Sequence, residues 1–156
     1  MLRDLTASDL ERVMRLEAEL FGPDAWTRSL YEAELARPDR IWRAVELDGA
    51  VVAYGGITIA LQSDLMTIGV TESHQGRGIG AQLLTDLTAA AQSNGARELF
   101  LEVRADNEIA QRLYLRHGFE QLGIRPRYYR GGIAAVVMRL TLREVGVGPV
   151  GAEVIT

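Results

Sequence analysis

The sequence lacks cysteine and lysine altogether. It has 156 residues, and all 17 of its basic residues are arginine. Without cysteine there is no disulfide framework, no thiolate zinc site and no cysteine nucleophile. Without lysine there is no P-loop lysine, no Schiff-base lysine and no lysine general base. The two histidines, His74 and His117, are too few for a three-histidine zinc site. We therefore expect no metal centre.

Long apolar runs and a surplus of positive charge are also missing. No segment approaches the roughly 20 apolar residues that a membrane helix needs, and residues 1–4 are charged rather than signal-like. The formal net charge of −4 argues against a nucleic-acid partner. The composition thus predicts a cytoplasmic protein that binds neither a membrane nor a nucleic acid. Its length and its 47% hydrophobic residues suit one domain with a sizeable core.

Hydrophobic periodicity and turn signals predict eleven elements in the order β-α-α-β-β-β-α-β-α-β-β. The predicted strands cover residues 2–5, 41–47, 50–61, 65–71, 97–103, 119–127 and 133–140, and the predicted helices cover residues 10–21, 26–36, 78–92 and 107–117. This order indicates an α/β (α+β) fold with a mixed, mostly antiparallel, twisted sheet and helices on both faces. We expect one domain over residues 1–142 and a loosely held tail over residues 143–156.

A glycine-rich turn, Gln75-Gly76-Arg77-Gly78-Ile79-Gly80, lies between a predicted strand and a predicted helix. Free backbone N–H groups at a helix start, the helix dipole and Arg77 together suit a phosphate group. A plain tight turn is the simpler alternative, but Gly80 inside a helix then lacks a reason. The spacing from Gly76 to Ala81 also fits a loose dinucleotide fingerprint. That fingerprint belongs in a first βα unit, whereas three antiparallel strands precede this turn.

The turn and four further stretches resemble the GNAT (Gcn5-related) N-acetyltransferases over about residues 2–141. Gln75, Gly78 and Gly80 match the family's Q/R-x-x-G-x-G/A motif. The other matching stretches are Thr67-Ile68-Gly69-Val70, Leu101-Glu102-Val103-Arg104, the run from Asn107 to Tyr114 with Gly118-Phe119, and Gly123-Ile124-Arg125-Pro126-Arg127-Tyr128-Tyr129. The last stretch resembles the RimI branch, the ribosomal-protein-alanine N-acetyltransferases.

The resemblance implies acetyl-CoA as the donor and a primary amine as the acceptor. It implies that backbone groups of one strand hold the thioester arm, that the glycine turn holds the pyrophosphate, and that an asparagine bonds the cofactor. The implied cofactor-binding residues are Ile68, Gly69, Val70, Gln75, Gly76, Arg77, Gly78, Ile79, Gly80, Ala81 and Asn107. In the glycine-rich positions, the absence of a side chain would permit close approach of the cofactor.

Glu102 and Tyr114 are the candidate catalytic residues. Glu102 interrupts an apolar strand, and alternation places it on the face opposite Leu101 and Val103, where it can accept a proton from the amine. A solvated carboxylate at a strand end is the alternative. Tyr114 is the candidate acid for the departing CoA thiolate, because its helix returns it to about the level of Glu102. A purely structural core tyrosine is the alternative.

The acceptor groove is predicted from two regions that face each other in the resembled family. Its candidate substrate-binding residues are Glu17, Trp26, Tyr31, Arg125, Tyr128 and Tyr129. The predicted activity is acetylation of a protein N-terminal α-amine, with a small-subunit ribosomal protein bearing N-terminal alanine as the acceptor. Transfer is expected to be direct within a ternary complex, because no cysteine can carry the acetyl group. Two alternatives stay open: a GNAT enzyme acting on lysine or a small-molecule amine, and a non-catalytic acetyl-CoA-binding subunit.

Overall fold

The computed structural model describes residues 1–142; the predicted tail, residues 143–156, lies outside the described residues. Its main elements are β1 (Leu2–Asp4), α1 (Leu10–Phe21), α2 (Arg28–Leu35), β2 (Arg40–Leu47), β3 (Ala50–Thr58), β4 (Gln62–Val70), α3 (Ile79–Ser93), β5 (Glu98–Arg104), α4 (Glu108–His117), β6 (Glu120–Arg125) and β7 (Ala135–Thr141). This is the predicted order of strands and helices. Short 3-10 turns, among them η2 (Gly22–Asp24) and η3 (Glu72–His74), connect some of them.

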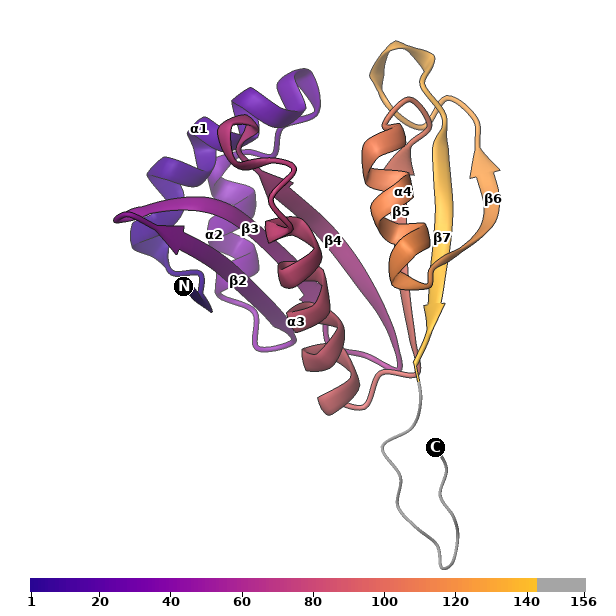
Figure 1. Cartoon of the computed structure of the whole chain (residues 1–156), viewed down its shortest axis with the longest axis horizontal. Helices are drawn as coiled ribbons and strands as arrows, with labels where there is room; N and C mark the ends of the chain where they lie inside the picture. The colour runs from indigo at the N-terminus through magenta and orange to yellow at the C-terminus, as the bar shows by residue number, and fades with distance from the viewer. Residues whose placement is uncertain (143–156) are drawn as a thin grey trace, which may run out of the picture.

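The strands form one sheet in the order β1-β2-β3-β4-β5-β7-β6. Neighbouring strands pair antiparallel except β4 and β5, which run parallel. The two halves of the sheet meet only where β4 and β5 begin, and they diverge from there (Figure 1). The predicted mixed, mostly antiparallel sheet is therefore confirmed, and its single parallel junction is the place where it opens.

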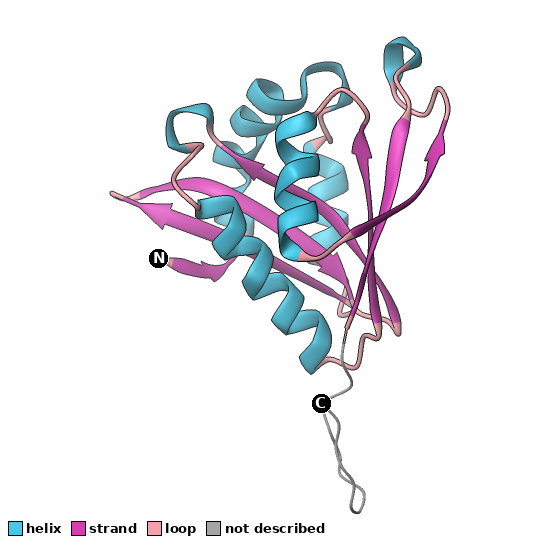
Figure 2. Cartoon of the chain, turned by 45° about the vertical axis from the view of Figure 1, so that its right-hand side comes forward, coloured by secondary structure: helices cyan, strands magenta, loops and turns pink. Residues whose placement is uncertain are grey.

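Each face of the sheet carries its own core (Figure 2). α3 and α4 cover one face, where Leu83, Leu84 and Leu87 are fully buried. α1 and α2 cover the other face around Leu16 and Tyr31. Because side chains alternate along a strand, β2 contributes residues to both cores. The predicted helices on both faces are confirmed.

Local turn chemistry explains where several elements meet. The turn between β2 and β3 uses Asp48 and Gly49, both with positive φ, as expected for a two-residue hairpin with an Asp-Gly sequence. α2 begins after Thr27, whose hydroxyl accepts a hydrogen bond from the Leu30 N–H. α4 ends at Gly118, which takes the left-handed conformation.

The boundaries around β4 differ from the prediction. β3 ends at Thr58 rather than at residue 61, and β4 begins at Gln62 rather than at residue 65. Residues 62–64 are polar, so they carry no apolar strand signal. They form a strand because they pair with the first three residues of β5. Among residues 1–142, no helix has the length and apolar character needed to cross a membrane.

Candidate active site

A cavity lies where β4 and β5 separate. Their pairing ends at Asp64 and Phe100, and the strands diverge beyond that rung. The cavity between them has a volume of about 1660 Å³. Pockets for one small ligand are typically about 300–1,000 Å³, so this cavity has room for parts of two substrates.

Nine of the predicted site residues line this cavity: Glu17, Trp26, Ile68, Glu102, Asn107, Tyr114, Arg125, Tyr128 and Tyr129. They come from both faces of the sheet, since α4 belongs to one face and α1 to the other. The remaining predicted residues are not part of its lining: Tyr31, Gly69, Val70, Gln75, Gly76, Arg77, Gly78, Ile79, Gly80 and Ala81.

β4 presents unpaired backbone to the cavity. In its pairing with β3, Leu65 lies opposite Ile57 and Thr67 lies opposite Gly56, so Met66 is an extra, bulged residue. Pairing with β5 has already ended here, so the N–H and C=O groups on that side of β4 have no strand partner within residues 1–142, and the Val70 C=O accepts a 2.9 Å hydrogen bond from the Gln75 side chain. Free strand backbone of this kind can bind an extended ligand by main-chain hydrogen bonds.

The glycine turn builds an open helix start beside the end of β4. Gly76 and Gly78 have φ of 79° and 81°, and Gly78 is the N-cap of α3. Because Gly78 has no side chain to cap the helix, the first N–H groups of α3 stay available. A Cβ built on Gly80 would lie 3.6 Å from Leu113 of α4 and 3.6 Å from Val70 of β4. The turn therefore sits between β4 and α4 and can receive an anion.

Gly69 and Gly80 differ in how closely their neighbours pack. A Cβ on Gly69 would come within 3.1 Å of the Tyr54 hydroxyl and 3.0 Å of Leu20, so these side chains would have to shift by a few tenths of an ångström. Packing against Tyr54 and Leu20 therefore favours glycine at this position, apart from the predicted close approach of a cofactor. A Cβ on Gly80 would make only ordinary contacts. Packing within residues 1–142 therefore does not account for a glycine at this position, and its role beside a ligand stays a prediction.

Glu102 projects from β5 toward the face of α1 and α2, as alternation predicts. Residues of β5 alternate between half-buried and buried, with Leu101 and Val103 in the opposite core. The Glu102 carboxylate forms a 3.0 Å ion pair with Arg125, whose side chain is 60% exposed. A hydrogen bond with Glu102, followed by burial, raises the pKa of Tyr128. The segment after β6 thus folds over the carboxylate while keeping it in contact with the cavity.

Tyr114 belongs both to the core and to the cavity. Its residue is 7% exposed, and its ring packs 5.6 Å from that of Phe119. Burial raises the pKa of the Tyr114 phenol well above its usual value, with a smaller contribution from Tyr129. No hydrogen bond from its hydroxyl to the described part of the chain is seen, yet the residue lines the cavity. It therefore holds its proton firmly at a place where a ligand can meet it.

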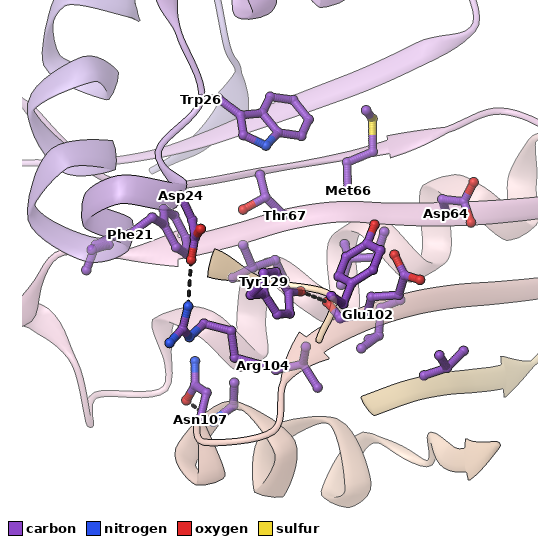
Figure 3. A pocket seen from close by; sticks show the side chains of 18 of the residues that line it. Phe21, Asp24, Trp26, Asp64, Met66, Thr67, Glu102, Arg104, Asn107 and Tyr129 are labelled. Atoms are coloured by element: carbon purple, nitrogen blue, oxygen red, sulfur yellow. Dashed lines mark hydrogen bonds and ion pairs between the residues drawn. The ribbon is translucent and has the colours of Figure 1, made fainter. Parts of the chain in front are cut away.

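Two further predicted residues frame this part of the cavity. Asn107 caps α4, because its side-chain oxygen accepts the Ala110 N–H at 3.1 Å, which leaves its amide NH₂ for another partner. Tyr129 donates a 3.3 Å hydrogen bond to the carbonyl of Glu102 (Figure 3). Burial, and then the charge of Glu102, raise the pKa of Tyr129 to about 12.

The opposite wall rests on a buried carboxylate. Glu17 is 2% exposed. Its carboxylate accepts hydrogen bonds from the backbone N–H of Trp26 at 2.7 Å and from the Tyr31 hydroxyl at 2.7 Å. Trp26 lines the cavity, and its ring lies 5.3 Å from that of Tyr31. Tyr31 itself is fully buried. It supports Trp26 from behind and does not reach the groove where we had predicted it.

Arg104 and Asp64 are two charged residues of the cavity that were not among the predicted site residues. Arg104 reaches across the opening to Asp24, with 2.6 Å between the charged atoms, and joins the two walls (Figure 3). Asp64 faces the same space from β4; partial burial and then the charge of Glu102 raise its pKa, while Arg40 opposes the shift. Arg104 lay within a matched stretch, but no local pattern connects it to a residue 80 positions away. Asp64 lay just before the predicted strand.

His117 lies at the C-terminal end of a helix, where a cation would be favourable. It is the last residue of α4, but its Nε2 lies 3.2 Å from the Thr88 hydroxyl of α3. Burial lowers the pKa of His117, which favours the neutral ring. The residue joins two helices rather than supplying charge.

A sheet that opens at one parallel junction, beside a helix start able to bind phosphate, suits an enzyme that binds a phosphate-bearing donor. The chain belongs to the acetyltransferase (GNAT) family, whose model matches residues 9–119. The predicted resemblance to this family is therefore confirmed.

Relatives of this chain act on protein N-termini. It is 40% identical to the N-alpha-acetyltransferase RimI of Mycobacterium tuberculosis over 142 residues, which cover 86% of this chain and 88% of the relative. It is 34% identical to the [ribosomal protein bS18]-alanine N-acetyltransferase of Salmonella typhimurium over 61% of this chain and 67% of that protein. The crystal structure of the ribosomal-protein-S18-alanine N-acetyltransferase from Escherichia coli superposes with a TM-score of 0.83 at 26% identity, covering 90% of this chain and 92% of that one.

Proposed function

We propose that the protein transfers the acetyl group of acetyl-CoA to the N-terminal α-amine of a protein, with the N-terminal alanine of ribosomal protein bS18 as the acceptor. The observation that carries this proposal is that Glu102 and Tyr114, from β5 and α4, line one cavity beside the free backbone of β4. The names of the relatives supply the acceptor.

Acetyl-CoA, when bound, supplies the activated thioester. The residues present fit such a donor, because the start of α3 offers open N–H groups and the space around the Cβ position of its N-cap, Gly78, is open. Backbone groups of β4 at Ile68–Val70 would hold the thioester arm. The first turn of α3, with Arg77, would hold the pyrophosphate, and the free amide NH₂ of Asn107 would donate to the arm.

Glu102 accepts the proton of the acceptor amine, through a water where the distance requires it. An α-amine has a pKa of about 8 and a lysine side chain about 10.4, so at neutral pH the α-amine is easier to deprotonate by roughly 3 kcal/mol. A carboxylate is a modest base, and this difference makes it adequate for an N-terminus. The amine would replace the Arg125 guanidinium as the partner of Glu102, and the Arg125 side chain is exposed enough to leave that pair.

Tyr114 holds the proton that the departing thiolate needs. A phenol kept neutral by burial can donate to sulfur without competing for the proton of the amine. Trp26 on one side, and Tyr128 and Tyr129 on the other, would enclose the first residues of the peptide. Because the chain has no cysteine, the amine attacks the donor directly, and the scheme uses no metal ion.

The test compares three acceptors with acetyl-CoA and the purified protein. A peptide with the first residues of bS18 and a free N-terminus should be acetylated, as measured by mass spectrometry. The same peptide with a blocked N-terminus and an internal lysine should not be, and polyamines should not be. Equal turnover of the blocked peptide would overturn the α-amine assignment, and turnover of polyamines alone would identify a small-molecule enzyme.

A further inference from the structure

α1 carries two carboxylates that point to different parts of the molecule. Glu17 and Glu19 are two positions apart, which on a helix separates their directions by about 200°. Glu17 is directed into the core between α1, α2 and β3, whereas Glu19 is exposed and reaches the segment after β4. One helix thus contacts two separate parts of the site.

The Glu17 carboxylate collects three hydrogen bonds and no cation within residues 1–142. Besides Trp26 and Tyr31, the Tyr54 hydroxyl donates to it at 2.6 Å. Burial of a charge is unfavourable unless strong hydrogen bonds compensate it, and three charge-assisted bonds do so here. Burial raises the pKa of both tyrosines, so they remain donors.

The bond to the Trp26 N–H connects this buried carboxylate with the acceptor wall. Trp26 lies between η2 and α2. Its backbone N–H is held by the hydrogen bond to Glu17 of α1. Its ring packs against those of Tyr31 and Trp42. Because the amide is anchored and the ring is packed, Glu17 determines where the indole stands in the cavity.

Glu19 makes the equivalent connection on the donor side. Its carboxylate accepts the backbone N–H of Glu72 at 2.8 Å and the hydroxyl of Thr71 at 3.1 Å. These residues lie between the end of β4 and the glycine turn, and Thr71 is buried. Glu19 therefore anchors the segment that leads from the free backbone of β4 into the turn at Gly76.

We propose that α1 positions the two substrate sites separately, with Glu17 setting the acceptor wall through Trp26 and Glu19 setting the approach to the glycine turn through Thr71 and Glu72. Both are positioning residues, since each acts through another part of the chain. The assignment of the sites rests on the proposed function.

The test exchanges each carboxylate and measures both substrates. Glu17→Gln should raise the peptide KM about tenfold and leave the Kd of acetyl-CoA, measured by calorimetry, within twofold. Glu19→Ala should raise the Kd of acetyl-CoA about threefold and leave the peptide KM within twofold. Glu11→Ala, on the exposed first turn of the same helix, is the matched control and should change neither. Equal rises of both constants in both variants, or no change in either, would overturn the proposal.

An NMR measurement separates this proposal from the proposed function. In Glu17→Gln, the resonance of the Trp26 backbone amide proton should move upfield and that of Glu72 should not change. In Glu19→Ala, the resonance of the Glu72 amide proton should move upfield and that of Trp26 should not change. If the parent protein acetylates no peptide, the proposed function fails, while these shifts and the Kd still decide the positioning roles.

If Glu17→Gln does not fold, Tyr31→Phe removes one donor from the carboxylate and should raise the peptide KM about threefold. An unmoved Trp26 amide in that variant overturns the role of Glu17.

Discussion

The two sides of the cavity differ in the groups that line them, with backbone on one side and side chains on the other. The proposed donor side consists of backbone: the edge of β4 that β5 does not pair with, two glycines with positive φ, and the open first turn of α3. The acceptor side consists of side chains tied to one another, such as Trp26 to Glu17 and Arg125 to Glu102. The first depends on the path of the chain, and the second depends on which side chains are present.

This difference predicts how each side responds to change. A backbone site tolerates most side-chain exchanges and fails when a residue cannot adopt the required φ. A side-chain site fails when one partner of a hydrogen bond or an ion pair is removed. The same family can therefore keep one donor while varying its acceptors, because acceptor residues can change without moving the strand that holds the donor. The predictions below test this contrast, starting with the largest effect.

The largest effect is expected at Glu102. Glu102→Gln keeps the shape of the side chain and removes the base, so kcat should fall roughly 10²–10⁴-fold. The Kd of acetyl-CoA should not change, because the donor side uses no part of this carboxylate. Steady-state rates and calorimetry measure both.

The control for that variant is Arg125→Gln, which removes the same ion pair and retains the carboxylate. Its kcat should fall far less than that of Glu102→Gln. Equal losses in the two variants would mean that the ion pair, rather than the base, matters.

The next effect belongs to the donor side. Gly78→Ala places a Cβ in open space but forces alanine to φ 81°, at a conformational cost of roughly 1–2 kcal/mol. Since the strain falls on the start of α3, the Kd of acetyl-CoA should rise about tenfold while the peptide KM stays the same. Gly95→Ala imposes similar strain beyond the other end of α3, where φ is 92°. Gly95→Ala should lower the melting temperature about as much as Gly78→Ala does, and it should leave the Kd of acetyl-CoA unchanged. If Gly95→Ala also raised this Kd, the effect of Gly78→Ala would reflect a general loss of stability.

A smaller effect is expected where the two walls meet. Asp24→Asn breaks the bridge to Arg104, in which both side chains are partly exposed. Exposed and half-exposed ion pairs contribute little, about 0–1 kcal/mol, so the peptide KM should rise only about two- to fivefold. Asp106→Asn removes the other carboxylate on the same guanidinium without touching η2, and it should have no such effect. The same rise in both variants would contradict a role for the cross-cavity contact.

The smallest effect concerns His117, which belongs to neither wall. Burial lowers its pKa in the folded protein, so the unfolded chain binds the proton more readily. Its contribution to stability is present above the unfolded pKa of about 6.5 and is lost as the pH falls through the lower folded value. The parent should therefore lose more melting temperature between pH 7.5 and 5.5 than His117→Gln does. Equal losses in the two proteins would contradict a contribution from His117, and kcat should be unchanged in the variant.

The sequence predicted what local patterns encode. The glycine turn, the Asp-Gly hairpin and the alternation that exposes Glu102 each depend on a few neighbouring residues, and each is found in the structure. The order across the sheet, with β7 between β5 and β6, depends on pairing between distant residues and left no local signal. The start of β4 was missed for the same reason, because its polar residues are strand only through β5.

The site shows the same division. Candidate residues were identified from motifs, but their partners were not. Nothing near Glu17 in the sequence indicates that it holds Trp26, because the contact requires α1 and α2 to pack on the same face. Likewise Arg104 and Asp24 meet only because β5 ends opposite η2. Sequence patterns supplied the candidate site residues, and tertiary packing determined which other residues contact them.

The short pairing between β4 and β5 has a consequence for how the two reactants reach the cavity. Three pairs of residues join the two halves of the sheet, and beyond them the strands separate and leave an opening through the sheet. Side chains from α4 border that opening on one face, and side chains from α1 and η2 border it on the other. The two reactants can therefore enter from opposite faces of the sheet and meet at this opening, and neither has to leave before the other can enter.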